Sequence, residues 1–153
     1  MRTLMPYLLI ALCCALADAQ TAVSPCALVT RAEVQEAAGV SISEGALNTT
    51  NKLVCDFKAG ATGSLVSLLL TTKEPADSAE KTATELNKRK IAATVVAGIG
   101  DGAYAASPGY GMQQLGAYKG AKHVVVTVLL MGAPEAKAKA VAVTIAKKAL
   151  ARM

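Results

Sequence analysis

Several runs of β-forming residues follow one another along this chain, separated mostly by short glycine-containing turns. In the first run Leu53, Cys55 and Phe57 share one parity, which is the period of a β-strand. Consecutive strands joined by tight turns pair antiparallel, so the pattern predicts an antiparallel sheet, with one of its turns at Pro108–Gly109. The predicted strands lie at residues 53–58, 64–72, 92–97, 103–106, 112–118 and 122–131.

Three helix patterns separate these strands into groups. Thr30 and Glu33 form a capping box, in which the threonine hydroxyl accepts from the glutamate amide and the glutamate side chain reaches back. Gly39 suits the left-handed cap that ends this helix, and Pro134 suits the first position of a long C-terminal helix with one broad apolar face. We expect the middle helix to be a surface helix. The predicted helices span about 31–39, 77–90 and 134–152.

Strands that come in sequential groups, rather than alternating singly with helices, favour an α+β fold. We predict one domain at residues 20–153, with the short N-terminal helix and the long C-terminal helix packed on an antiparallel sheet. In the last strand Val124 and Val126 are apolar on one parity, and Val125 and Leu129 are apolar on the other. A sheet with one wet face alternates more cleanly, so we expect the central strands to be covered on both faces.

The N-terminus has the pattern of a secretory signal peptide. Arg2 gives a positive start, residues 4–16 form an almost uninterrupted apolar run, and Ala17-Asp18-Ala19 supplies the small-x-small cleavage pattern. We therefore predict a signal peptide at residues 1–19, cleaved after Ala19, and a secreted or periplasmic product that begins at Gln20. The apolar run is shorter than the ~18 residues that a membrane-spanning helix needs, so we do not expect an integral membrane protein.

Removal of this segment leaves two cysteines, Cys26 and Cys55. An exported chain with an even number of cysteines usually pairs them, so we predict a Cys26–Cys55 disulfide on the core side of the sheet. A zinc site needs about four ligands, and two cysteines with the single histidine are too few. Cys13 and Cys14 lie within the signal peptide, and neither follows a small residue, so we do not expect a lipoprotein.

The segment Pro25–Val34 resembles the "PC-x-L-[LV]-T-x-x-E-V" opening of secreted bacterial proteins and lipoproteins that contain a domain of unknown function, actinobacterial lipoproteins among them. In that set a second cysteine follows near a strand, as Cys55 does, and then a "G-[LIV]-G-D-x-A" segment, as at Gly98–Ala103. A "KG" turn precedes a valine-rich strand and a terminal helix, as at Lys119-Gly120. The resemblance implies a Mog1/PsbP-like α+β fold. It implies no activity, and the missing lipidation motif removes the implication of a membrane tether.

No motif predicts a catalytic residue, a cofactor or a metal ligand. The loop Gly98–Gly102 follows a strand, but a phosphate-binding loop needs a helix directly after its glycines, and Pro108–Gly109 leaves no room for one. We interpret this loop as a bulged turn in which Asp101 caps nearby amides. His123 lies on the parity opposite the core, without a Gly-x-Ser-x-Gly nucleophile motif, and is interpreted as a half-exposed surface residue.

Positive charge is concentrated in the last part of the chain, where residues 119–153 carry seven Lys or Arg residues against Glu135 alone. Lys137, Lys148 and Arg152 fall on one side of the predicted helix and could contact an anionic surface weakly. The alternative is a solvated helix face whose cations favour the C-terminal end of the helix dipole. We do not expect nucleic-acid binding, because only 3% of residues are aromatic and stacking partners for bases are therefore lacking.

Taken together, the sequence predicts an exported, non-catalytic binding or interaction domain with an envelope or extracellular partner. The alternative is a small secreted, hydrolase-like enzyme that lacks a recognisable motif. A pocket with convergent polar groups would favour the enzyme. A closed core with a bare basic or apolar patch would favour the interaction domain.

Overall fold

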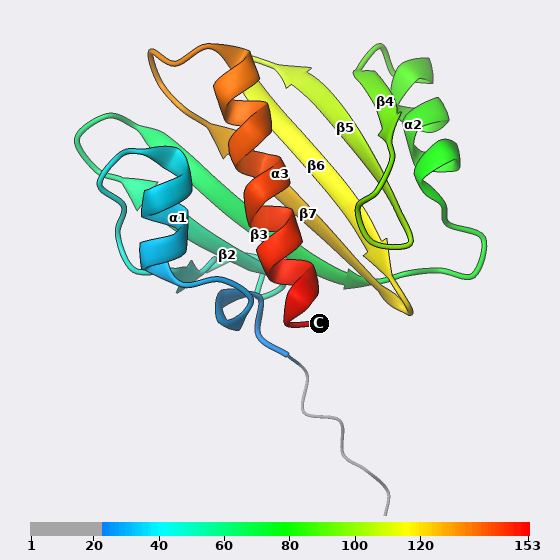
Figure 1. Cartoon of the computed structure of the whole chain (residues 1–153), viewed down its shortest axis with the longest axis horizontal. Coiled ribbons are helices and arrows are strands. Elements are labelled where there is room, and N and C mark those ends of the chain that lie inside the picture. The colour runs from blue at the N-terminus through cyan, green and yellow to red at the C-terminus, as the bar shows by residue number, and fades with distance from the viewer. Residues whose placement is uncertain (1–22) are drawn as a thin grey trace, which may run out of the picture.

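The chain folds into one antiparallel sheet with helices packed against it (Figure 1). The computed structural model describes residues 23–153, so the predicted signal peptide, its cleavage site and its two cysteines lie outside the described residues. The helical elements are η1 (Pro25–Ala27), α1 (Arg31–Ala38), α2 (Ala79–Lys88) and α3 (Glu135–Ala151). The strands are β1 (Ala46–Leu47), β2 (Val54–Ala59), β3 (Ser64–Thr72), β4 (Ala92–Val96), β5 (Gly102–Gly109), β6 (Met112–Lys119) and β7 (Lys122–Leu129).

The strand order across the sheet is β1-β2-β3-β7-β6-β5-β4, and every neighbouring pair is antiparallel. The β2–β3 hairpin and the β4–β7 meander meet at the centre, where β3 pairs with β7. The short α1 and the long α3 lie together across one face of this sheet (Figure 1). The predicted α+β fold is therefore confirmed.

Two local features differ from the sequence-based expectation. The turn predicted at Pro108–Gly109 lies instead at Tyr110 and Gly111, whose φ angles of 55° and 74° suit a two-residue hairpin turn. Pro108 and Gly109 belong to β5, at a register shift where the missing proline N–H is tolerated. The two-residue β1 was not predicted, because so short a strand in a polar segment has no periodicity to detect.

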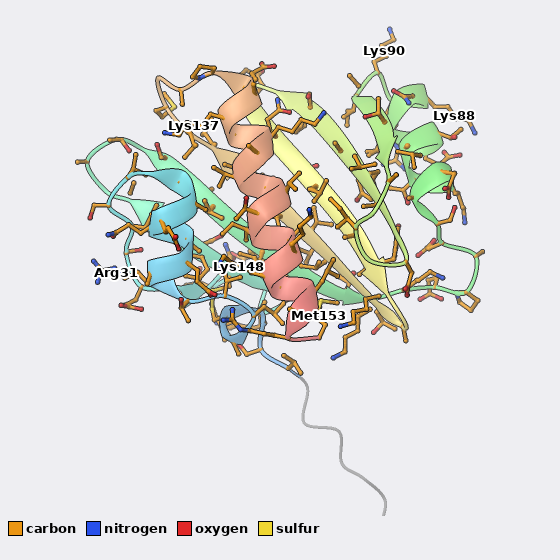
Figure 2. The ribbon with its side chains drawn as sticks, viewed as in Figure 1. Arg31, Lys88, Lys90, Lys137, Lys148 and Met153 are labelled. Atoms are coloured by element: carbon orange, nitrogen blue, oxygen red, sulfur yellow. A yellow bond between two sulfur atoms is a disulfide. The ribbon has the colours of Figure 1, made fainter. Side chains whose placement is uncertain are left out.

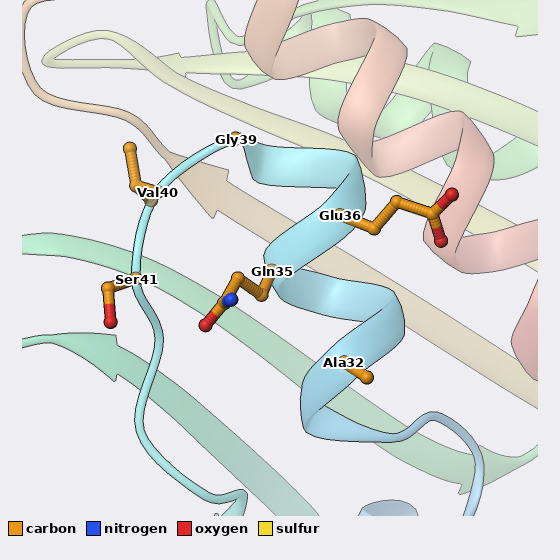
Figure 3. A pocket seen from close by; sticks show the side chains of 6 residues that line it. All are labelled: Ala32, Gln35, Glu36, Gly39, Val40 and Ser41. Atoms are coloured by element: carbon orange, nitrogen blue, oxygen red, sulfur yellow. The ribbon is translucent and has the colours of Figure 1, made fainter.

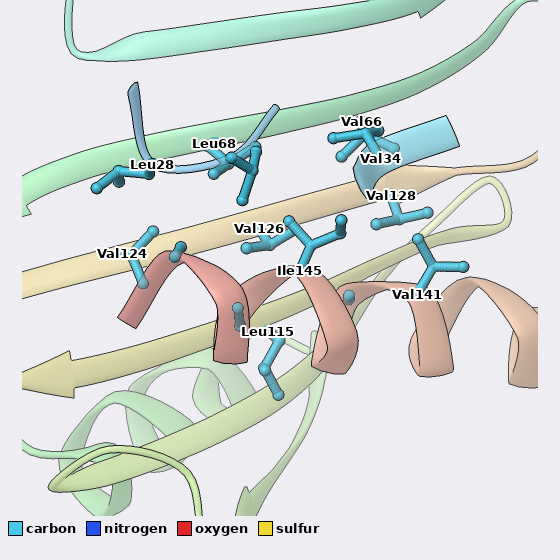
Figure 4. Close-up of a cluster of buried hydrophobic side chains, with 14 of the residues drawn as sticks. Leu28, Val34, Val66, Leu68, Leu115, Val124, Val126, Val128, Val141 and Ile145 are labelled. Carbon is cyan, nitrogen blue, oxygen red and sulfur yellow. The ribbon is translucent and has the colours of Figure 1, made fainter. Parts of the chain in front are cut away.

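The first sheet face carries the main hydrophobic core, beneath α3 and α1 (Figure 4). Val141 and Ile145 project from α3 into the same cluster as Val126 and Val128 of β7, and all four side chains are buried. Alternate residues of the strands supply the sheet side of this core, as the strand period predicts. Alanines on α3, such as Ala142, let the helix lie close to the sheet because they add little bulk.

The second sheet face is only half covered. Here α2 packs on β4, β5 and β6, where Ala79 and Ala83 meet Tyr104 and Tyr118. Residues 23–153 place no helix over β2, β3 and β7 on this side, so the prediction that the central strands are covered on both faces is wrong for β3 and β7. Neighbouring strands alone leave these side chains half-buried. We call this surface the open half-face; it comprises Val54, Asp56, Leu65, Ser67, Leu69, Thr127 and Leu129.

The predicted disulfide joins Cys26 of η1 to Cys55 of β2, with Cα atoms 5.1 Å apart. Cys55 is fully buried, as its parity predicts. The chain just before β1 passes very close to it, since a Cβ built on Gly45 would lie 2.6 Å from the Phe57 ring and 2.9 Å from Cys55 Sγ. Only glycine fits at this position, and its close approach closes the core beside the disulfide.

The glycine-rich loop before β5 is a turn, as predicted. Gly98 and Gly100 have positive φ angles of 75° and 57°, and a Cβ on Gly100 would collide with the carbonyl oxygen of Tyr118. Asp101 Oδ2 accepts from the Gly120 amide at 2.6 Å, while its own amide donates to Tyr118 O at 2.8 Å. The loop leads directly into β5 and fixes the turn between β6 and β7.

Candidate functional site

Two of the three cations predicted to contact anions are engaged within the fold. Arg152 donates to both carboxylate oxygens of Glu33 at 2.7 and 2.9 Å and to Leu28 O at 2.8 Å. Lys148 Nζ lies 3.5 Å from Glu33 Oε1. Lys137 is exposed towards the other end of α3 (Figure 2). Lys148 and Arg152 thus connect α3 to the start of α1, and contact with an external anion stays a prediction.

The Glu33 carboxylate lies at the centre of that connection. It accepts the Thr30 amide at 2.9 Å and completes the predicted capping box. Hydrogen bonds from Arg152, and then from the Thr30 amide, lower the pKa of Glu33 to about 2. Because the carboxylate is charged at neutral pH and pairs with Lys148 and Arg152, this cluster holds α1 against α3, and its one negative and two positive groups leave a net charge of +1.

His123 and two tyrosines form a cluster at the border between α2 and the open half-face. The rings of His123 and Tyr118 stack with centroids 4.3 Å apart, and Tyr104 Oη lies 3.4 Å from His123 Nε2. Burial lowers the pKa of His123 and raises the pKa of Tyr104 to about 12. Both groups are therefore uncharged at neutral pH. His123 is half-exposed as predicted, but its aromatic partners come from β5 and β6, which a linear pattern does not connect.

The open half-face has an acidic centre with apolar residues on both sides. Asp56 Oδ1 accepts from Ser67 Oγ at 2.6 Å, and its Oδ2 accepts from Asn48 Nδ2 at 2.9 Å. These two neutral donors fix the orientation of the carboxylate. In the part of the chain that the structure describes, Asp56 forms no salt bridge. Its negative charge is therefore left without a cationic neighbour at bonding distance.

The strand register arranges this surface in rows. Asp56 pairs across the strands with Ser67 and then with Thr127, whose Oγ1 accepts from Gln114 Nε2 at 3.0 Å. Leu65 lies opposite Leu129 on one side of this polar row, and Leu69 lies opposite Val54 on the other. A polar row therefore crosses β2, β3, β7 and β6. The row of Leu65 and Leu129 ends at the exposed Lys58 on β2, and the row of Val54 and Leu69 continues to the buried Val125 on β7. Chemically, such a surface can bind an apolar group that carries a cation.

Two shallow hollows flank the exposed side of α1. The larger, of about 470 Å³, is open to solvent, and Gln35 points towards its loop while Glu36 points away (Figure 3). The second, of about 420 Å³, contains the Arg31–Glu44 ion pair, whose atoms lie 3.4 Å apart. The Gln35 side chain accepts the Ile42 amide at 3.4 Å and so holds the loop. These polar groups bond one another rather than converging on an empty centre.

Metal and membrane chemistry can be stated only for the described chain. Residues 23–153 contain no group of three or more His, Cys, Asp or Glu side chains placed to hold a metal ion. None of the helices in this range has the length and apolarity to cross a membrane. No family model, curated protein or solved structure matches the chain, so its function is inferred from the geometry of its own residues.

The polar row of the open half-face was not recognised from the sequence, although its residues can be found there. Asp56, Ser67 and Thr127 are polar residues on the second parity of three strands, and the register places them side by side. On the same parity each strand also carries a second polar residue, namely Lys58, Thr71 or His123, so no strand alone distinguishes the row. The row becomes visible once the pairing of β3 with β7 is known, and that pairing joins distant parts of the chain.

Proposed function

We propose that this chain is an exported, non-catalytic binding domain whose partner is a protein of the bacterial envelope or the extracellular space. The proposed contact is the open half-face. The observation that carries the proposal is that helical cover on the second sheet face ends at β6, while apolar side chains continue to β2. Apolar side chains of β2, β3 and β7 are therefore left on this face without a helix over them.

The energetics favour a partner over water on this surface. Complete burial of a leucine side chain contributes about 1.5–3 kcal/mol. Leu65, Leu69 and Leu129 obtain only part of that stabilisation from their own fold, because each stays half-buried. A partner that covered the three side chains would recover the remainder in one contact.

Asp56 indicates the charge of the partner. A lysine or arginine side chain has an aliphatic stem that can lie on the leucines and a cationic head that can reach the carboxylate. Ser67 and Asn48 already orient that carboxylate, so little ordering is needed on binding. We therefore propose that the partner presents a basic residue within an apolar segment.

The proposal can be tested by site-specific cross-linking in the exporting cell. Benzoylphenylalanine is placed at Leu69 in the open half-face or, as a matched control, at Thr144 on the exposed side of α3. We expect a discrete protein adduct from position 69 and none of the same size from position 144. The substitution Asp56→Asn, made together with the probe at position 69, should reduce the adduct several-fold. Equal adducts at both positions, or none at position 69, would contradict the proposal.

Export itself is part of the proposal and has three supports. The N-terminal pattern is that of a signal peptide, and the Cys26–Cys55 disulfide is typical of an oxidising compartment. The resemblance to secreted bacterial proteins with a Mog1/PsbP-like fold adds a third. Intact-mass measurement of the exported product should show a chain that begins at Gln20. A mass that includes residues 1–19, or a diacylglycerol on Cys13 or Cys14, would contradict cleavage without lipidation.

The alternative of a small secreted enzyme would rest on His123. A general base must lie within about 3.2 Å of the proton that it removes, directly or through one water. The polar side chain beside His123 Nε2 is Tyr104, at 3.4 Å, and burial raises the pKa of that tyrosine to about 12. Such a phenol is a poor nucleophile at neutral pH. Binding is therefore the better-supported proposal, and it predicts that His123→Ala leaves the cross-link at position 69 intact.

A further inference from the structure

The outer edge of β4 is held by a side chain instead of by another strand. β4 is the last strand of the sheet and pairs on one side with β5. On its other side the Ala93 amide donates to Asn87 Oδ1 at 3.0 Å, and Asn87 Nδ2 donates to Ala93 O at 2.9 Å. Both backbone groups of Ala93 therefore point away from β5 and are satisfied by Asn87.

The amide of Asn87 has the same donor and acceptor as a peptide group, so it occupies the place of a neighbouring strand. Backbone groups alternate in direction along an antiparallel strand, so those of Val95 share the outward direction of Ala93. The position of Asn87 is fixed by the tight connection from α2, in which the Ile91 amide donates to Leu86 O and Lys90 takes a positive φ of 63°. The outward backbone groups of Ala93 are thus hydrogen-bonded to Asn87, whereas those of Val95 are not bonded to Asn87, and the Val95 side chain is 49% exposed.

The two ends of the sheet are protected by different means. The edge at β1 is only two residues long, and short edges offer little to pair with. β4 has five residues, and its sequence Ala92–Val96 contains neither a charge nor a proline, which are the usual protection of an edge strand. Lys88 and Lys90 lie near it (Figure 2) but belong to the preceding segment. Asn87 is therefore the residue that interrupts pairing along β4.

We propose that the outer edge of β4 is a strand-addition surface for a second copy of this chain, and that Asn87 keeps it closed. In a symmetric antiparallel pairing, Ala93 of each copy would exchange hydrogen bonds with Val95 of the other. Every hydrogen bond of that pairing uses an Ala93 group, and Asn87 occupies both of those groups. The inference concerns a different surface from the open half-face and does not depend on the proposed function.

The experiment compares oligomeric state by sedimentation velocity across a concentration series. Wild-type protein and the control Thr84→Ala, an exposed residue of the same helix, should show no association through β4. Asn87→Ala should associate with an affinity about tenfold or more above that of the wild type, because the Ala93 groups become available. Adding Val95→Pro to this variant removes the outward amide of Val95 without touching β5, and should return the protein to the wild-type state.

Two results would overturn the inference. One is a folded Asn87→Ala protein that associates no more than the wild type, and the other is association that Val95→Pro does not suppress. If Asn87→Ala folds poorly, Asn87→Asp retains the acceptor for the Ala93 amide, loses the donor to Ala93 O, and should show an intermediate affinity. Amide hydrogen exchange gives an independent measure: the Ala93 amide should exchange more slowly than the Val95 amide in the wild type. Equal rates would contradict the role of Asn87.

Discussion

The two halves of the second sheet face differ in what covers them, although their strands have similar patterns in the sequence. Beneath α2 the surface consists of Tyr104 and Tyr118 with small residues, and the Tyr104 ring lies against Gly116. On the open half-face the surface consists of leucines on both sides of the Asp56 row. On the covered half, small residues such as Ala93 and Ala106 lie beside the tyrosines, so the alanines of α2 can pack against it.

The difference indicates why α2 does not extend over the whole face. Covering Asp56 with an apolar helix would remove the carboxylate from water without supplying a cation, which is costly. On the covered half the buried hydroxyl of Tyr118 finds a partner in Thr82 of α2, at 2.8 Å. The covered half therefore satisfies its polar groups within the chain, whereas the open half-face leaves its carboxylate available.

The sharpest test of this comparison uses two adjacent leucines of β3 that face opposite sides of the sheet. Leu68 is fully buried in the main hydrophobic core, whereas Leu69 is half-buried on the open half-face. We expect Leu68→Ala to lower the free energy of unfolding by about 3 kcal/mol and Leu69→Ala by about 1 kcal/mol. Urea denaturation measures both. Equal losses would mean that the second face is covered in solution, and the comparison would fail.

A second substitution disrupts the covered half. A Cβ on Gly116 would collide with the Tyr104 ring, so Gly116→Ala must displace the tyrosine and loosen α2. We expect a loss of about 2 kcal/mol in the free energy of unfolding, as for other overpacked cores. Gly60→Ala is the matched control, because nothing lies within 4 Å of its Cβ, and it should change stability by less than about 0.5 kcal/mol. Similar losses in the two variants would remove Tyr104 as the support for α2.

Alkaline pH should also lower the stability of the covered half. Burial raises the pKa of Tyr104 to about 12 from an ordinary value of 10.0, so the folded state favours the protonated phenol. This contribution is fully present below pH 10 and is lost as the pH rises towards 12, at about 1–2 kcal/mol. Urea titrations between pH 9 and pH 11 should therefore show a steeper loss in the wild type than in Tyr104→Phe. Parallel curves would contradict the burial of this hydroxyl.

Acidic pH should weaken the Glu33–Arg152 pair on the first sheet face, which gives a test independent of the covered half. The pKa of Glu33 is lowered to about 2, chiefly by Arg152, so its ionised form stabilises the fold above its ordinary pKa of 4.5. That stabilisation disappears as the pH falls from 4.5 towards 2, and it amounts to about 1 kcal/mol because solvent screens the pair. Stability curves of the wild type and Glu33→Gln should therefore converge on acidification. A constant difference between them from pH 7 to pH 3 would contradict the pairing.

The features that were predicted correctly are those determined by short-range sequence. The Thr30–Glu33 capping box, the glycine loop with Asp101, and the parity that buries Cys55 each depend on residues within one element or turn. The half-covered face was missed because periodicity reports which residues are apolar, not whether a helix reaches them. The pairing of Arg152 with Glu33 was missed for a related reason, since a cation on a helix has no local sign of a partner elsewhere in the chain.

The central pairing of β3 with β7 has a consequence for the order of folding. Thr71 and His123, which are in contact across it, lie 52 residues apart, so the middle of the sheet can close only after β7 is available. Contacts between distant residues slow folding, because the intervening loop must be ordered first. A chain that crosses a membrane through a narrow channel must stay unfolded until it has passed. If the chain is exported as proposed, the central pairing of β3 with β7 can form only after β7 has emerged on the far side.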